Sequence, residues 1–301
     1  LYLNTATYIG RAFQLLGYHK RALTVLHKAL PYMEKTENTE CKVIFFSTIA
    51  DIYLSLANME QGLEYLMKGI EQARNIDNPR VLARILNNAG NVLATEKAYD
   101  TATGVYAGCL DLLKESESDA GLRTKIMLNL TRIELEKGND TEVAKTIPLI
   151  LTEIMALPDS FHKVSNLITL SRLATEIRKK LDRKLTSESS DIRNIQSDLV
   201  TSAYMAMDDV RRMGEKTQDN RVMSYANGYM GQLYEAEGRY SEALNLTRRA
   251  IFFAQQGEFP QILYRWQWQT GRLFRAKGDI EKAVDAYKDA ITTLNPIRRE
   301  L

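Results

Sequence analysis

The stretch that decides the fold occurs twice near the end of the chain, as GYMGQLYEAEGRYSEA at residues 228–243 and WQTGRLFRAKGDIEKA at residues 268–283. Both copies contain a glycine, an aromatic residue three positions later, a second glycine four positions after that, and then an alanine after five more. The copies begin 40 residues apart. A fixed period of this length is the signature of a repeat protein, so further copies are expected along the chain.

Weaker copies of the pattern precede the two clear ones. The first small residues of these copies are Gly10, Ala50, Gly90 and Thr131. They are spaced by 40, 40 and 41 residues. From there to Gly231 is 100 residues, which is two repeats plus about 20 residues. We therefore expect a seventh, divergent repeat in that interval, with Ala174 as its small residue.

Each repeat is expected to form two antiparallel helices. In the first helix, apolar residues recur at helical spacing, as at Phe46, Ile49, Ala50 and Tyr53. The glycine that follows, such as Gly238, suits the left-handed backbone that ends many helices. The predicted spans, first helix/second helix, are 3–16/19–34, 40–56/59–75, 79–96/99–115, 119–137/140–156, 160–181/190–214, 219–237/240–257 and 259–277/280–295.

The sequence thus predicts an all-α fold, a right-handed superhelical solenoid of about seven helix pairs with a period of about 40 residues, in one continuous domain. The expected repeats are 1–38, 39–78, 79–117, 118–158, 159–217 (divergent), 218–258 and 259–301. The fifth repeat has longer helices, and its polar connection at 184–190 is expected to be mobile.

The composition agrees with a helical protein and excludes several other classes. Gly and Pro, 16 and 6 of 301 residues, are too few for the frequent turns of an all-β fold. The net charge of +2 gives no general attraction to nucleic acid or to a membrane surface, and no stretch approaches the roughly 20 apolar residues of a membrane helix. We expect no nucleic-acid or membrane partner and a cytoplasmic location, where two cysteines stay reduced.

The arrangement resembles the tetratricopeptide repeat (TPR), which has small and aromatic residues at corresponding positions but a period of 34 residues. The period of 40 lengthens each helix by most of a turn. The end of the chain, with YRWQWQTGRL at 264–273 and AKGDIEKA at 276–283, is similar to the end of the repeat array in bacterial TPR–CHAT proteins. In that family a caspase-like protease domain follows. The resemblance implies that this chain is a piece of a longer bacterial protein.

The residue types that enzymes use form no recognisable constellation. Cys109 occupies a small-residue position of a second helix, which indicates packing. Cys41 begins a helix whose dipole could lower the thiol pKa, but no histidine is predicted near it. His19 and His27 could share a helix face, yet zinc requires further nitrogen or sulfur ligands. We expect no catalytic residue, metal or cofactor in this region, so chemistry inside the solenoid is the weaker hypothesis.

Function is expected on the concave face of the solenoid, which the first helices line. Two positions in each first helix should project there: the residue directly after the small residue, and the residue two before it. The first position holds Arg11, Asp51, Asn91, Arg132, Thr175, Gln232 and Arg272. The second position holds Tyr8, Thr48, Asn88, Asn129, Arg172, Tyr229 and Gln269.

Amide side chains can bond a peptide backbone in either direction, and arginine can fork onto a carboxylate. The polar members of these positions are therefore the predicted binding residues for a protein or peptide: Asn88, Asn91, Asn129, Arg132, Arg172, Gln232, Gln269 and Arg272. The densest cluster among them is Asn88, Asn91, Asn129 and Arg132.

The end of the array is predicted to have its own docking face. The last helix carries an apolar stripe of Ile280, Ala283, Val284, Tyr287 and Ile291, flanked by Ala286, Ala290 and Leu294. The stripe is expected to pack on the preceding helix, which leaves the flank for a following domain or a second copy of the chain. In the preceding helix, Trp266 and Trp268 point roughly 200° apart, so one should be buried and the other exposed.

These patterns indicate a protein- or peptide-binding scaffold that regulates or targets a fused or partner effector. By resemblance, that effector is a CHAT caspase-like protease. The alternative is a free-standing peptide receptor, similar to bacterial quorum-sensing regulators with long tetratricopeptide repeats. Those that regulate transcription directly carry an upstream DNA-binding helix-turn-helix, and this chain shows none.

Overall fold

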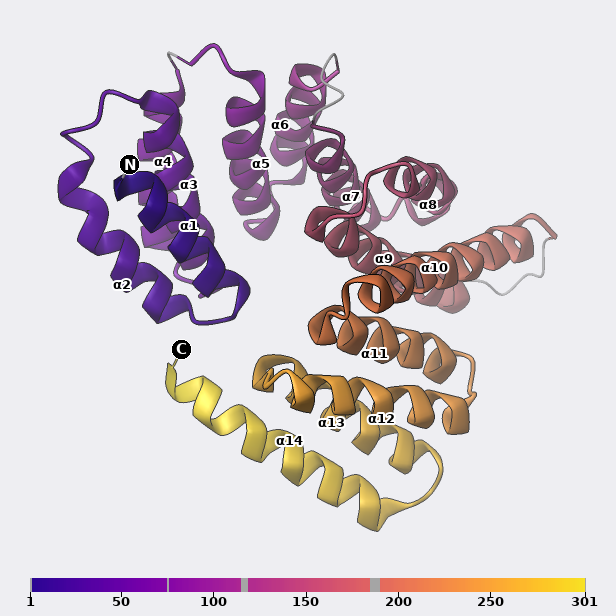
Figure 1. The fold of residues 1–301 in the computed structure, drawn as a ribbon. Helices are drawn as coiled ribbons and strands as arrows, with labels where there is room; N and C mark the ends of the chain where they lie inside the picture. Colours follow the sequence, from indigo (N-terminus) through magenta and orange to yellow (C-terminus); the bar gives the residue numbers. More distant parts are fainter. Residues whose placement is uncertain (1, 75, 115–118, 185–189, 301) are drawn as a thin grey trace. The chain divides into compact units, whose positions relative to one another are not determined.

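The structure, a computed structural model, describes residues 2–74, 76–114, 119–184 and 190–300 (Figure 1). All regular elements in these ranges are helical. The helices are α1 (Tyr2–Leu15), α2 (His19–Ala29), the 3₁₀ turn η1 (Leu30–Tyr32), α3 (Thr39–Ser55), α4 (Met59–Ala73), α5 (Pro79–Thr95), α6 (Tyr99–Leu112), α7 (Ala120–Glu136), α8 (Asp140–Met155), α9 (Phe161–Lys184), α10 (Ser190–Thr217), α11 (Asn220–Ala236), α12 (Tyr240–Gln256), α13 (Pro260–Ala276) and α14 (Ile280–Glu300).

The chain divides into two compact units, and the boundary lies within α7. Unit 1 comprises the described residues up to 133 together with Glu300, and unit 2 comprises the described residues of 134–299. Within each unit, successive helices form antiparallel pairs that stack side by side. The predicted all-α solenoid of helix pairs is confirmed in both units, whereas the single continuous domain stays a prediction.

The helices begin at residues that suit the unpaired backbone N–H groups of a first helical turn. In unit 1 the side chains of Asn38, Asn58 and Asn78 each accept a hydrogen bond from a backbone N–H three residues later, at N···O distances of 2.9, 3.2 and 3.3 Å. Such caps satisfy amides that have no partner inside the helix. Pro79 and Pro260 occupy the first turns of α5 and α13, where the missing N–H costs nothing. The predicted helix starts are accordingly correct to within a residue.

The turn inside each pair recurs at the predicted period. A left-handed residue precedes the second helix of six pairs, with φ of 82°, 58°, 60°, 93°, 72° and 82° at Gly17, Ala57, Lys97, Gly138, Gly238 and Gly278. Four of the six are glycines, which adopt this conformation without steric cost. The repeat period in the sequence is therefore the spacing between these turns.

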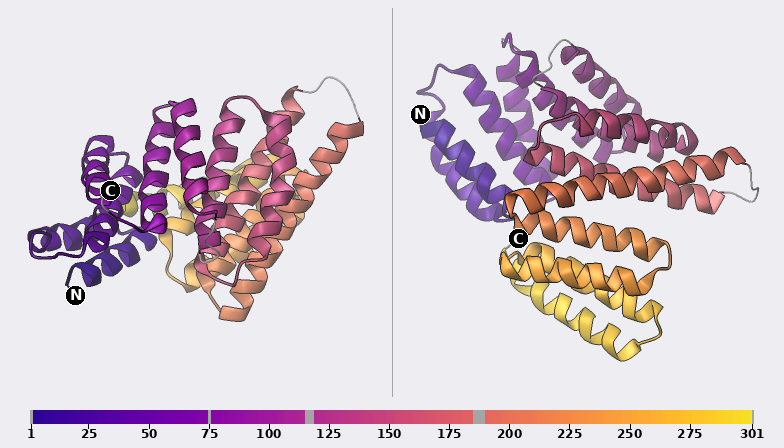
Figure 2. Two further views of the ribbon diagram at one scale, coloured as in Figure 1. Left: turned by 90° about the horizontal axis from the view of Figure 1, so that it is seen from above. Right: turned by 45° about the vertical axis from the view of Figure 1, so that its right-hand side comes forward.

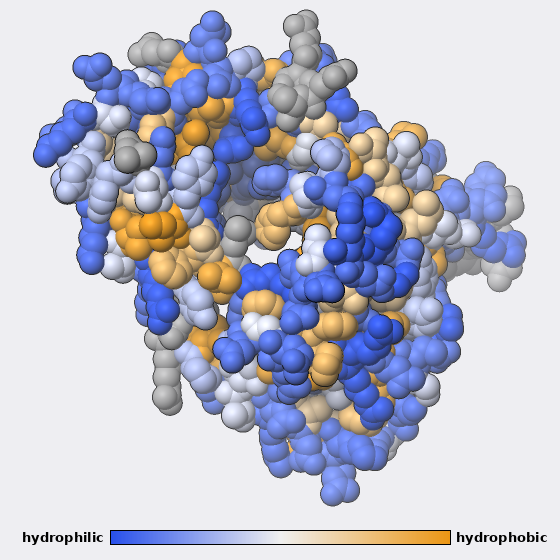
Figure 3. All heavy atoms as spheres, viewed as in Figure 1, coloured by the Kyte–Doolittle hydropathy of each residue, from blue (hydrophilic) through white to orange (hydrophobic). Residues whose placement is uncertain are grey.

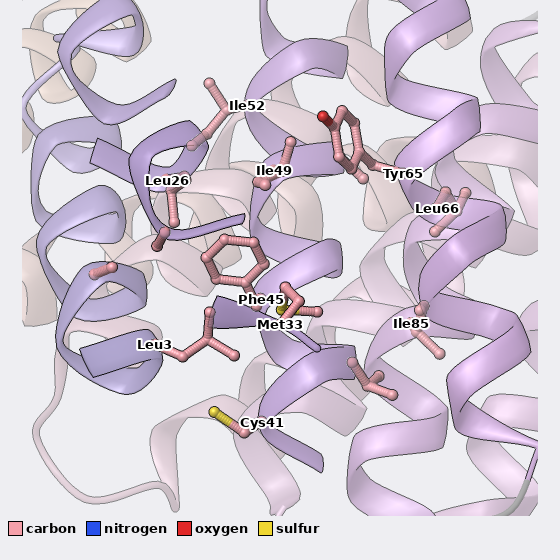
Figure 4. Packing of buried hydrophobic residues seen from close by; sticks show 14 of the residues in the cluster. Leu3, Leu26, Met33, Cys41, Phe45, Ile49, Ile52, Tyr65, Leu66 and Ile85 are labelled. Atoms are coloured by element: carbon pink, nitrogen blue, oxygen red, sulfur yellow. The ribbon is translucent and has the colours of Figure 1, made fainter. Parts of the chain in front are cut away.

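The core of unit 1 lies between the stacked pairs (Figure 4). Phe45 and Ile49 of α3 are fully buried, with Leu26 of α2 on one side and Leu66 of α4 and Ile85 of α5 on the other. A buried side chain of this size contributes about 1.5–3 kcal/mol relative to exposure. Because consecutive pairs share the same core, no pair could bury its apolar face alone.

In unit 2, Trp266 of α13 is the largest fully buried side chain of the described residues. Its indole N–H donates to Ser224 Oγ of α11 at 3.0 Å, and its ring meets the Tyr229 ring edge to face at 5.3 Å. Trp268, two residues on, keeps 48% of its surface exposed. The prediction that one tryptophan is buried and the other exposed is confirmed.

The fifth pair consists of α9 and α10, the longest helices described, which extend beyond their neighbours (Figure 2). The polar connection that was expected to be mobile lies at 185–189, outside the described residues. At the opposite end of this pair, Lys163 is buried and its Nζ donates to the carbonyl oxygens of Met155 and Leu157. The same ammonium lies 3.3 Å from Oδ2 of Asp209, which is also buried. This ion pair ties α9 to α10.

Five helix ends differ from the sequence prediction by three residues or more. α6 ends at Leu112, three residues before the prediction, and α9 continues to Lys184, three residues beyond it. The second helix of the first pair ends at Ala29, and Pro31 follows within a 3₁₀ turn, because proline cannot donate the next helical hydrogen bond. α10 continues to Thr217, three residues beyond the prediction. α14 continues through Pro296 to Glu300, so the predicted end at residue 295 is wrong.

The face that α14 presents to its neighbour also differs. Ala283, Ala286 and Ala290 are buried, whereas Ile280, Val284 and Ile291 are exposed. Small alanines allow close approach, and Tyr287 lies over Gly271 of α13. Ala283 and Tyr287 of the predicted stripe therefore pack inward as expected. The expectation is wrong for Ile280, Val284 and Ile291, which are exposed, and for Ala286 and Ala290 of the flank, which are buried.

Glycines in the first helices permit close approach within a pair. A Cβ added at Gly90 would lie 2.6 Å from the ring of Tyr106, and one at Gly231 would lie 2.9 Å from Thr247 Oγ1. Replacing either by leucine should overpack the pair and lower the free energy of unfolding by about 1–3 kcal/mol or more. Urea denaturation followed by circular dichroism measures this effect.

Gly104 of α6 is the matched control, because a Cβ there would meet nothing within 4 Å. Gly104→Leu should leave stability unchanged or raise it, since leucine favours helix over glycine by under about 1 kcal/mol. Equal denaturation midpoints for all three variants would contradict the assigned close approaches.

Candidate functional site

In unit 1, the predicted amide cluster comes together on α5 and α7, but its members bond to one another. Asn129 Nδ2 donates to Oδ1 of Asn91 at 3.1 Å and to Oδ1 of Asn87 at 3.0 Å. The Tyr106 hydroxyl donates to the same Asn91 oxygen at 2.6 Å. These amides therefore hold helices together as well as lining a surface.

In α5 and α13, the residue two before the small residue faces the preceding first helix. Asn88 of α5 is 2% exposed and donates to Ser47 Oγ of α3 at 2.9 Å. Gln269 of α13 is fully buried, and its Nε2 donates to the Gly228 carbonyl of α11 at 3.1 Å and to Thr247 Oγ1 at 2.8 Å. The expectation that Asn88 and Gln269 project into an open groove is corrected, because neighbouring first helices pack over this position.

The residue directly after the small residue keeps access to solvent in every pair. Arg132 is exposed, and the others, Arg11, Asp51, Asn91, Thr175, Gln232 and Arg272, are half-buried. Only this one of the two predicted positions is available to a ligand along the whole series.

Charges gather around Asp51 in unit 1. Burial raises the pKa of the Asp51 carboxyl above its usual value, while Lys125, Arg11 and Arg84 oppose that shift. Burial, together with repulsion from Arg11 and Arg80, lowers the pKa of Arg84. Sequence reasoning missed Arg84 and Lys125. Arg84 lies four residues before Asn88, so helical spacing alone places both on one face.

In unit 2, the first helices α9, α11 and α13 surround a pocket of about 490 Å³. It is lined by Thr175, Lys179, Gln232, Glu235, Ala236, Tyr240, Arg272, Arg275 and Ala276. Gln232 and Arg272 are two of the predicted binding residues. Arg272 forks onto Glu235, with Nε and Nη2 at 2.9 and 2.8 Å from the two carboxylate oxygens. This bidentate pair raises the pKa of Arg272 and fixes its guanidinium in the pocket wall.

Arg172, the remaining predicted residue, lies on α9 outside this pocket. Its side chain is exposed, and its guanidinium lies over the ring of Tyr229, 5.8 Å from the centroid. The surface of unit 2 visible in Figure 3 is mainly hydrophilic with smaller hydrophobic patches. The structure therefore brings Gln232 and Arg272 together and places Arg172 apart from them.

The cysteines occupy packing positions. Cys109 is fully buried, and burial raises the pKa of its thiol to about 11. Burial also raises the pKa of Cys41, whose Sγ lies 2.6 Å from Asn4 Oδ1. The expectation that the Cys41 pKa could be lowered is wrong, because burial disfavours the charged thiolate.

The described residues also bear on metal binding and on insertion into a membrane. No group of three or more His, Cys, Asp or Glu side chains there could hold a metal ion. No described helix is both long and apolar enough to cross a bilayer.

Comparison with known proteins gives the class. A tetratricopeptide-repeat family model matches residues 46–76, which cover most of α3 and α4. The chain has no match among curated protein sequences. Among solved structures, the apo form of RapI is similar over 100% of this chain and 98% of its own, with 15% identity and a TM-score of 0.59.

Two further structures share the fold. The Rap conjugation gene regulator of plasmid pLS20, in complex with the Phr* peptide, has a TM-score of 0.61 and 15% identity, covering 99% of this chain and 74% of its own. A signal transduction ATPase with a tetratricopeptide-repeat sensor, from Pyrococcus horikoshii, has a TM-score of 0.59 and 16% identity, covering 96% of this chain and 42% of its own. The chain contains a tetratricopeptide repeat and shares the fold of helical-repeat proteins.

Proposed function

We propose that this chain is a non-catalytic scaffold that binds a peptide or an extended protein segment through its first helices. The observation that carries the proposal is the pocket in unit 2. Three consecutive first helices contribute polar side chains to it, and its volume of about 490 Å³ lies within the range of ligand pockets. Gln232 there offers both a donor and an acceptor to a peptide backbone.

The similar structures help to choose between a free-standing peptide receptor and a regulator of a fused or partner protease. One is a complex with the Phr* peptide, and another similar structure, with a TM-score of 0.58, is a Rap protein complexed with competence and sporulation factor. Those ligands favour a free-standing peptide receptor. The rival proposal, regulation of a fused or partner CHAT protease in a bacterial cytoplasm, depends on the resemblance of residues 264–283 and stays a prediction.

Selection of random dodecapeptides on phage, followed by calorimetry of the enriched peptides, tests the scaffold proposal. Gln232→Ala removes one hydrogen-bonding side chain and should weaken binding about 3–10-fold. Thr175→Ala, on α9 of the same pocket, removes a second hydrogen-bonding side chain and should weaken binding by a similar factor. Lys145→Ala on α8, an exposed position, is the control and should change nothing.

Two outcomes contradict the proposal: no peptide is enriched, or enriched peptides bind both variants as tightly as the unaltered chain. Asn91→Ala is a poor test by comparison. It would leave the Tyr106 hydroxyl and the Asn129 amide without their shared acceptor, and so lower stability together with any binding.

The exposed apolar stripe of α14 is proposed as a second contact surface, for a following domain or a second copy of the chain. Ile280, Val284 and Ile291 have 59%, 44% and 51% of their surface exposed. Sedimentation equilibrium should show reversible dimers of the 301-residue chain, and Val284→Glu with Ile291→Glu should convert them to monomers. A monomer before the substitution would contradict the second copy as the occupant of this surface.

A further inference from the structure

Unit 2 has a second pocket, of about 530 Å³, between the second helices α10 and α12. Both helices pack on α11, which also contributes to the lining (Figure 1). The residues that α11 gives to this pocket and to the pocket of α9, α11 and α13 lie on opposite faces of the helix, by its spacing of 3.6 residues per turn. The two pockets share no residue, so this is a separate site.

The lining includes a buried hydrogen-bond acceptor that has no donor. Asn227 of α11 is 1% exposed, and its Nδ2 donates to the Met223 carbonyl of the same helix at 2.8 Å. Its Oδ1 accepts no hydrogen bond from any residue the structure describes. A buried acceptor without a donor is destabilising, so an occupant of the pocket that carries an N–H group would supply what the site lacks.

The side chains around this acceptor suit an aromatic ring. Tyr204 of α10 and Tyr234 of α11 meet edge to face, with ring centroids 5.6 Å apart, and both line the pocket. Met205 and Met230 line it as well, and Met205 keeps 49% of its surface exposed. Methionine is unbranched and makes favourable contacts between its sulfur and aromatic rings, so these walls can repack around a ring that reaches Asn227.

The charges of the pocket favour a neutral occupant. Arg211 and Asp208 of α10 bond to each other, with Nη2 and Oδ1 2.7 Å apart. Arg249 of α12, which is exposed, is the other charged residue of the lining. Its guanidinium disfavours a cationic occupant, whereas the face of an aromatic ring attracts it. An apolar ring with an N–H group and no charge is the indole of tryptophan.

The opposite face of α11 already binds an indole in this way. Trp266 donates its N–H to Ser224 Oγ at 3.0 Å, and its ring meets Tyr229 and Tyr225 edge to face at 5.3 and 6.5 Å. That indole is therefore held by one polar acceptor and two tyrosine rings. The pocket between α10 and α12 presents the same combination, with Asn227 as its acceptor, and has no indole of this chain in its lining.

We propose that the pocket of α10, α11 and α12 binds a tryptophan side chain of a partner protein, with the indole N–H donating to Asn227 Oδ1. The pocket volume is in the range that holds a drug-sized ligand. It therefore has room for the residues that flank a tryptophan as well as for the ring, which favours a protein segment over free indole. This inference goes beyond the proposed function and does not depend on it.

Saturation-transfer NMR titrations of the 301-residue chain test the proposal with four small probes. The probes are N-acetyltryptophanamide, its analogue methylated on the indole nitrogen, N-acetylphenylalaninamide and free indole. N-acetyltryptophanamide should bind with a Kd on the order of 0.1–1 mM. The methylated analogue and the phenylalanine probe cannot donate to Asn227 Oδ1 from the ring, and should bind about 5-fold or more weakly.

Two variants locate the binding in this pocket. Asn227→Leu removes the acceptor at similar volume and should abolish the preference for the unmethylated probe, with circular dichroism unchanged because Oδ1 has no bond to lose. Met205→Arg changes an exposed wall and should weaken binding of N-acetyltryptophanamide about 10-fold or more, so the test does not depend on the buried substitution. Leu149→Arg on α8, at a position 67% exposed and outside the pocket, is the matched control and should change nothing.

Three outcomes overturn the inference. Equal affinity for the methylated and unmethylated probes, or no binding of either, rules out the hydrogen bond to Asn227. Binding that survives Met205→Arg places the probe elsewhere on the chain. Free indole bound more tightly than N-acetyltryptophanamide rules out a tryptophan within a protein segment as the occupant. None of these outcomes affects the proposed peptide site of α9, α11 and α13, which shares no residue with this pocket.

Discussion

Trp266→Ala is expected to lower the free energy of unfolding by about 3–5 kcal/mol. The side chain is fully buried between α11 and α13, so its removal leaves a cavity as well as losing apolar burial. Its indole N–H also supplies a hydrogen bond to Ser224, whose hydroxyl in turn donates to the Ala250 carbonyl of α12. Gly228 lies directly against the ring, and a glycine has no side chain that could move into the space left on that side.

Guanidinium denaturation followed by circular dichroism measures the effect, with Trp268→Ala as the matched control on the same helix. Trp268 is half exposed and contacts only one other ring, that of Tyr287 at 4.7 Å, among the ring contacts of the described chain. Its replacement should cost about 1 kcal/mol or less. If the two variants lost equal stability, the assignment of the buried and exposed tryptophans would be incorrect.

Lys163→Met is expected to cost about 3 kcal/mol, because it leaves a buried carboxylate and two carbonyl oxygens without their cation. Asp209 keeps its ion pair with Arg212, at 2.7 Å, which places the cost at the lower end of the range for broken buried pairs. Thermal denaturation measures the change.

The double variant Lys163→Met with Asp209→Leu should regain much of the loss, since an apolar pair of similar volume often replaces a buried ion pair without cost. Lys145→Met on α8, which breaks an exposed ion pair with Glu142, should alter stability by under about 1 kcal/mol. Additive losses at positions 163 and 209 would contradict direct coupling between the two side chains.

The ion pair between Lys163 and Asp209 is a contact that local sequence patterns do not predict. Lys163 and Asp209 are 46 residues apart, in the repeat with the weakest match to the pattern. Each looks like an ordinary charged residue on a helix. Their partnership depends on how α9 and α10 are aligned, and helical periodicity carries no information about that alignment.

The candidate site was predicted only in part, because helical periodicity gives no information about how neighbouring helices are aligned. The position after the small residue keeps access to solvent, as at Gln232 and Arg272 of the pocket, and its role in binding stays a prediction. The position two before it was misassigned at Asn88 and Gln269. Both positions lie on one side of an isolated helix, and the preceding first helix covers only one of them.

The sequence by itself determined the helices, their pairing and the period of 40 residues. Those features depend on interactions between residues three or four apart and on single turns, such as those at Gly17 and Gly238. Only the tertiary structure decided how far each helix is rotated about its axis. That rotation buries Gln269 and Ala290, exposes Ile291 and directs Lys179 and Arg275 into one pocket. It is set by packing between helices that are distant in the chain, where shape and desolvation outweigh any local preference.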